Sequence, residues 1–76
     1  MNEFYKLFIR TKLWFIEDNL LFFKEKTQSY REILTSPVLD VKEREYIKNI
    51  NLVYLNKHNQ LLNERNTLLT KLQNAS

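Results

Sequence analysis

Apolar residues recur at helical spacing along almost the whole chain, in two segments separated by one break. Between residues 3 and 34, and again between 41 and 73, apolar side chains return every three or four residues without a glycine or proline. The break holds Pro37, which cannot continue a helix and disfavours helical geometry at Ser36. The pattern therefore predicts helices over about 3–34 and about 41–73, joined by a turn over about 35–40.

The turn carries a start signal for the second helix. Asp40 followed by Glu43 fits a capping box, in which the aspartate accepts an orphan amide and the glutamate reaches back. Ser36 with Pro37 at the first helical position is a competing start. Because a short connection makes neighbouring helices antiparallel, we expect a single all-α domain over residues 1–76, a two-helix antiparallel hairpin. Thr27, with Gln28 and Ser29, is a weak point that could kink the first helix.

The first helix is apolar around more of its circumference than one neighbour can cover. At about 100° per residue, a central aromatic stripe is flanked by apolar residues on both sides, and the polar strip is narrow. A patch of this size exceeds the few hundred Å² that soluble monomers expose. We therefore expect the hairpin to dimerise into a four-helix bundle, with residues 4–23 at the assembling end.

Ten residues are predicted to form the oligomer or partner interface. Most of them belong to the apolar arc of the first helix, and the others lie on the second helix, where Leu52 and Val53 stand behind the main apolar face. The set is Phe4, Phe8, Trp14, Phe15, Phe22, Phe23, Leu52, Val53, Leu61 and Leu68.

Composition argues against catalysis. The chain has no cysteine, no glycine and a single histidine, so disulfides, thiolate metal sites and glycine-rich phosphate loops are excluded. No serine has a base beside it in sequence, and the adjacent Glu17 and Asp18 lie about 100° apart on a helix, so they do not converge. We expect no enzyme activity, no metal and no cofactor.

His58 falls within the apolar face of the second helix. If opposed residues are counted outward from the centre of the turn, Asp18 lies opposite His58, and Thr11 lies opposite Arg65. One interpretation is a pH-sensitive or ligand-binding site. The other, which we favour, is a buried polar layer of Asp18, His58 and Arg65 that fixes register and oligomeric state.

The charge pattern gives weak support for a nucleic-acid partner. Twelve basic and nine acidic residues leave a net charge of +3, spread along the chain. Lys6, Arg10, Lys24 and Arg31 lie in the polar strip of the first helix and are the candidate contacts. In length and topology the hairpin resembles plasmid copy-number regulators, which are helical hairpins that dimerise into four-helix bundles and bind paired RNA loops. That resemblance implies an RNA-binding dimer.

The functional hypothesis is a small non-enzymatic interaction module that self-associates through the first helix and binds a protein partner in the cytoplasm. Nucleic-acid binding by a hairpin dimer is the alternative, and a peripheral membrane protein resting on the aromatic helix is a further one. A membrane span is not expected, because Glu17 and Asp18 interrupt the most apolar stretch, which is also shorter than the ~20 residues a span needs.

Overall fold

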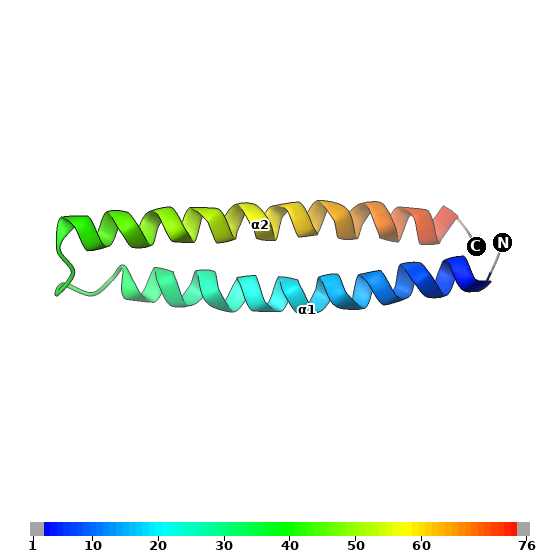
Figure 1. Cartoon of the computed structure of the whole chain (residues 1–76), viewed down its shortest axis with the longest axis horizontal. Coiled ribbons are helices and arrows are strands. Elements are labelled where there is room, and N and C mark those ends of the chain that lie inside the picture. Colours follow the sequence, from blue (N-terminus) through cyan, green and yellow to red (C-terminus); the bar gives the residue numbers. More distant parts are fainter. Residues whose placement is uncertain (1–2, 75–76) are drawn as a thin grey trace.

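The computed structural model describes residues 3–74 as a rod of two antiparallel helices (Figure 1), with principal extents of 57 × 14 × 13 Å. Helix α1 spans Glu3–Ile33 and helix α2 spans Val41–Asn74. No strand is present in the part of the chain that is described. The expected all-α chain of two helices is confirmed.

The two helices meet along a seam with a seven-residue repeat. Buried and half-buried residues follow each other at alternating steps of three and four on both helices, which is the spacing of coiled coils. On α1 and the residue after it, the seam consists of Lys6, Ile9, Leu13, Ile16, Leu20, Phe23, Thr27, Tyr30 and Leu34. On α2 it consists of Arg44, Ile47, Asn51, Tyr54, His58, Leu61, Arg65, Leu68 and Leu72.

Helix α1 does not turn its aromatic stripe toward α2. Ile9, Ile16 and Leu20 are buried in the seam, whereas Phe15 and Phe22 are exposed on the other side. The reason is the length of the two stripes. Apolar spacing on the seam side continues beyond Phe22 through Tyr30 to Leu34, so it matches α2 along the whole rod, while charged residues replace the aromatic stripe after Phe22.

An aromatic cluster fills the part of the seam nearer the turn. The Tyr54 ring stacks on Tyr30 at 5.5 Å between centroids and lies 5.6 Å from the Phe23 ring. Thr27 lies between Phe23 and Tyr30 in the sequence and is buried in the seam. Its small side chain leaves room for the Tyr54 ring. The Thr27 hydroxyl donates to the Lys24 carbonyl at 3.0 Å, and α1 runs unbroken through this point, so the expected kink is absent. Burial among these rings raises the pKa of Tyr30, and the neighbouring Tyr54 adds to the shift.

The start of α2 is fixed by Asp40. Its Oδ1 accepts the backbone N–H of Glu43 at 2.8 Å, as an N-cap residue does. This hydrogen bond lowers the pKa of Asp40, whereas the hydrogen bond that the Glu43 side chain shares with Asp40 raises the pKa of Glu43. The competing start at Ser36 and Pro37 is not used, because α2 begins at Val41.

Arg44 ties the turn to the first turns of α2. Its guanidinium donates to the carbonyl of Leu34 at 2.8 Å and to that of Ser36 at 2.7 Å. Carbonyls at the end of a helix have no partner within the helix, so a cation there satisfies them and also favours the negative end of the helix dipole. Arg44 therefore connects the first turn of α2 to the end of α1 and to the turn.

We predict that Arg44→Ala lowers the free energy of unfolding by about 1.5–3 kcal/mol, because two charge-assisted hydrogen bonds to half-buried carbonyls are lost. Chemical denaturation followed by circular dichroism measures the change. Lys42→Ala, an exposed residue in the first turn of α2, is the matched control and should change stability by less than about 0.5 kcal/mol. Equal effects of the two substitutions would contradict the anchoring role of Arg44.

Candidate interaction surface

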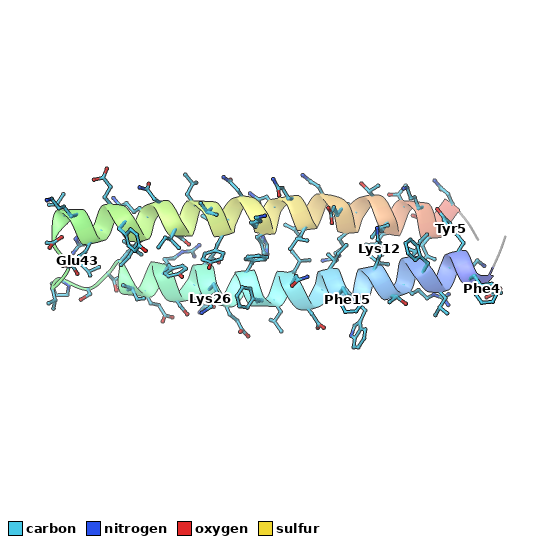
Figure 2. All side chains as sticks on the ribbon, viewed as in Figure 1. Phe4, Tyr5, Lys12, Phe15, Lys26 and Glu43 are labelled. Atoms are coloured by element: carbon cyan, nitrogen blue, oxygen red, sulfur yellow. The ribbon has the colours of Figure 1, made fainter. Side chains whose placement is uncertain are left out.

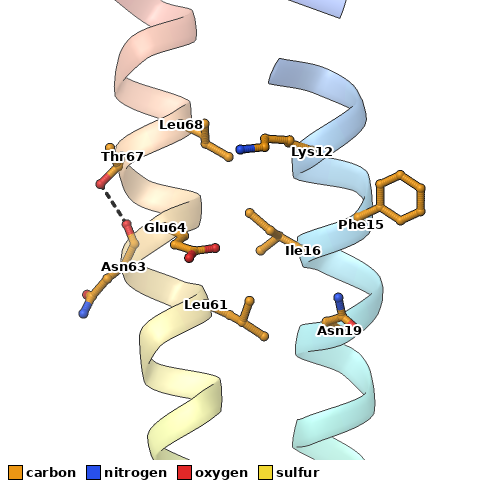
Figure 3. A pocket seen from close by; sticks show the side chains of 9 residues that line it. All are labelled: Lys12, Phe15, Ile16, Asn19, Leu61, Asn63, Glu64, Thr67 and Leu68. Carbon is orange, nitrogen blue, oxygen red and sulfur yellow. Dashed lines mark hydrogen bonds between the residues drawn. The ribbon is translucent and has the colours of Figure 1, made fainter. Parts of the chain in front are cut away.

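Three apolar pairs follow one another at seven-residue intervals on the side of α1 that faces away from α2. We call these six residues the outer face: Leu7, Phe8, Trp14, Phe15, Leu21 and Phe22. Seven residues are close to two helical turns, so the pairs lie above one another. Side chains project from this side of α1 in Figure 2, and the close view in Figure 3 shows Phe15 pointing away from α2.

The outer face exposes more apolar surface than a monomer of this size normally leaves in water. Its side chains are 46–65% exposed. Aromatic side chains present about 150–250 Å² each, so the six residues together expose on the order of 700 Å². The chain exposes 6122 Å² in all, whereas a compact monomer of this mass exposes roughly 5,000 Å². The exposed area is larger than that of a compact monomer because each helix of a two-helix rod has only one neighbour to pack against.

Polar residues lie between the apolar pairs of the outer face and along one side of it. Thr11 and Asp18 lie between successive apolar pairs, and both are exposed. The Lys12 Nζ lies 5.3 Å from the centroid of the Phe8 ring, and the Lys26 Nζ lies 5.8 Å from that of Phe22. A lysine over an aromatic ring is attracted by the negative face of the ring. The aromatic column is therefore bordered by positive charge on one side.

The structure places the ten predicted interface residues in two environments. Seven are exposed, namely Phe4, Phe8, Trp14, Phe15, Phe22, Leu52 and Val53. The other three, Phe23, Leu61 and Leu68, are half-buried in the seam between the helices. On α2, Leu52 and Val53 are exposed, as is Tyr46 two turns earlier, and we call these three residues the α2 patch.

A groove of about 650 Å³ opens beside the outer face (Figure 3). Its apolar floor is formed by Ile16 of α1 and by Leu61 and Leu68 of α2. Phe15 also lines it, so the groove and the outer face are continuous. Leu61 and Leu68 are half-buried, like the other seam residues of α2.

One of the three residues predicted to form a buried polar layer does not belong to it. Asp18 is exposed on the outer side of α1 and does not face His58. Arg65 lies beside Glu17 instead of Thr11, with its Nε 3.2 Å from the glutamate Oε1. The contact is an ion pair without hydrogen-bond alignment, and because both side chains are partly exposed it adds little stability. The residues that face each other across the seam are therefore not those found by counting outward from the centre of the turn.

A longer polar column takes the place of that layer. Arg44, Asn51, His58 and Arg65 are half-buried and occupy every seventh position of the α2 seam. The Oδ1 of Asn51 is buried and accepts no hydrogen bond. Their seven-residue spacing was visible in the sequence, and it is the signal that would have identified the column. Polar residues at such positions specify register at a cost in stability.

The four basic residues proposed to contact nucleic acid share one side of α1. Arg10, Lys24 and Arg31 are separated by multiples of seven residues, and Lys6 lies one turn before Arg10. Lys6 and Arg10 also line a shallow pocket with Leu69 and Leu72 of α2 at the open end of the hairpin. Glu17 interrupts the row, but its carboxylate is paired with Arg65.

Three further observations bear on the site. Within residues 3–74, no three histidine or carboxylate side chains converge as a metal ion would require. Neither helix, over the residues described, combines the length and apolar content needed to cross a membrane. Comparisons with protein-family models, with curated proteins and with solved structures give no match.

We predict that Asn51→Leu raises the free energy of unfolding by about 1–3 kcal/mol, because it removes a buried acceptor that lacks a partner and fills a seam position with an apolar side chain. Thermal and chemical denaturation measure the effect. Asn56→Leu introduces the same change at an exposed position of α2 and should stay within about 0.5 kcal/mol of the parent. A loss of stability in Asn51→Leu would show that the amide is satisfied in solution.

Proposed function

We propose that this chain is a non-enzymatic interaction module that self-associates through the outer face of α1 and binds a protein partner through α2. The observation that carries the proposal is the outer face itself, three large apolar pairs left in water at seven-residue intervals. Each such side chain gains about 1.5–3 kcal/mol when it is fully buried, so covering the face is strongly favourable.

The size of the outer face supports the proposal that a second copy of the chain packs against it. Stable interfaces bury about 800 Å² from each partner, which is close to the area that the six residues expose. The face is also rich in phenylalanine and tryptophan, which are enriched in the cores of interfaces. Two hairpins joined in this way form a four-helix assembly in which α1 of each copy is central.

The α2 patch supports a second binding event. Tyr46, Leu52 and Val53 are 57–68% exposed, and they belong to the helix that the second copy would not cover. The patch lies in the half of α2 nearer the turn, whereas the outer face is centred on Trp14 and Phe15, in the half of α1 nearer the open end. Self-association would therefore leave the patch accessible to a protein partner.

The reactive residues support a binding role over catalysis. The single histidine, His58, is half-buried in the seam, and the chain contains no cysteine. The seam residues one heptad away on either side of His58 are Asn51 and Arg65, neither of which serves as a general base. His58 is thus part of a structural column in this proposal.

We predict that the double substitution Trp14→Ser/Phe15→Ser shifts the protein from dimer to monomer at micromolar concentration, because it removes the central pair of the outer face. Sedimentation equilibrium measures the mass. The control, Val38→Ser/Val41→Ser, removes two apolar side chains that are even more exposed, in the turn and at the first residue of α2, and should leave the dimer intact. A wild-type chain that stays monomeric and instead cosediments with anionic vesicles would overturn the proposal in favour of a lipid-facing surface.

A nucleic-acid partner is the second candidate, and the shared side of Lys6, Arg10, Lys24 and Arg31 favours it. Three of these residues follow the seven-residue repeat, so they form a row along the rod. In a dimer, two such rows would present positive charge to a phosphate backbone. Binding of that kind weakens steeply with salt, because it depends on the release of counterions.

If this second candidate holds, Lys24→Gln/Arg31→Gln reduces affinity for a paired RNA hairpin and lowers the slope of log affinity against log salt by about two for each row that contacts the RNA. Fluorescence anisotropy over 50–200 mM salt measures both quantities. Lys57→Gln/Lys71→Gln removes the same charge from exposed positions of α2 and serves as the control. Identical effects of the two pairs, or affinity that does not depend on salt, would exclude the row as a nucleic-acid site.

A further inference from the structure

We propose that the second copy docks antiparallel to the first, with the two α1 helices in contact and the two-fold axis level with Trp14 and Phe15. This inference rests on the proposed self-association and adds the orientation of the partner. The occupant of the outer face is thus a second copy of this chain in one defined arrangement.

The first argument is that the three apolar pairs of the outer face have the same spacing in either direction along α1. Its three apolar pairs are centred on the pair Trp14 and Phe15, and one polar residue lies midway between each two pairs. In an antiparallel dimer centred there, the pair at Leu7 and Phe8 meets the partner's pair at the other end of the face. A surface that binds itself about a two-fold axis must be self-complementary in this way.

The second argument is the position of Asp18. Its exposed carboxylate lies within the outer face, between the central apolar pair and the last one. A parallel dimer in register would bring two Asp18 carboxylates together among apolar rings, where charges of like sign repel strongly. In the antiparallel arrangement each Asp18 lies opposite Thr11 of the other copy, which is uncharged, so the two carboxylates are kept apart.

The charges beside the outer face favour the same orientation. Arg10 lies toward one end of the face and Glu17 toward the other, on the same side of α1. Rotation about a two-fold axis brings Arg10 of each copy toward Glu17 and Asp18 of the other. In a parallel dimer the same side of the two α1 helices lies on opposite flanks of the interface, so these opposite charges are not brought together. Complementary charges across an interface fix register and suppress the wrong arrangement.

The arrangement sends the two turns to opposite ends of the dimer. The axis lies about 18 residues from the end of α1, which at ~1.5 Å per residue is close to 28 Å. Adding the turn, two Val38 residues are separated by about 70 Å in the antiparallel dimer. In a parallel dimer the turns are neighbours, and the separation is below about 30 Å.

Dipolar electron spin resonance on the full-length chain tests this inference. Because the chain has no cysteine, Val38→Cys carries a single nitroxide label, and its position on the exposed turn lies outside the outer face. We expect a distance of about 70 Å between labels. A distance below about 30 Å would show a parallel dimer and would overturn the orientation while leaving self-association standing.

Asn66→Cys supplies the matched control. This exposed residue of α2 is nearly level with the proposed axis, because Arg65 lies beside Glu17. Both orientations therefore place the two labels about 30–35 Å apart, across four helices. Absence of any coupling at this position would mean that no dimer forms, and a distance below about 20 Å would mean that α2 forms the interface. Either result would overturn the proposed function as well as the orientation.

Discussion

A helix with a single neighbour buries one side, and the other side must be compatible with water or be covered by something else. Helix α1 has large apolar side chains on both sides, and α2 covers only the side that contains Ile9, Ile16 and Leu20. The remaining side keeps Trp14 and Phe15 more than half exposed. The proposed dimer, its orientation and the separate α2 patch all follow from this excess of apolar surface over available partners.

The sequence predicts where the two helices begin and end, but it does not predict which side of α1 packs against α2. Pro37 and Asp40 marked the break and the start of α2 because proline and N-cap chemistry act locally. The face that α1 turns to α2 depends on the match between two stripes along the full rod, which no single residue reveals. Counting outward from the turn placed Asp18 opposite His58 and Thr11 opposite Arg65, whereas in the structure Glu17 lies beside Arg65.

The α2 seam gives up stability for a defined alignment. Four of its nine positions are polar, and a buried Asn51 oxygen lacks a hydrogen bond. An apolar seam would bind α1 more tightly but would also tolerate sliding by a turn or pairing with other chains, because leucine-rich stripes discriminate poorly between registers. The stacking of Tyr54 on Tyr30 and its contact with Phe23 add a shape constraint to this alignment.

The shared seven-residue period of the seam and the outer face restricts how the length of α1 can change. Inserting one residue into a helix rotates everything after it by about 100°, which would turn part of the outer face toward α2 and part of the seam toward solvent. Insertion or deletion of seven residues would preserve both sides at once. Variants of this rod that retain both contacts should therefore differ in helix length by whole heptads, with matching changes in α2.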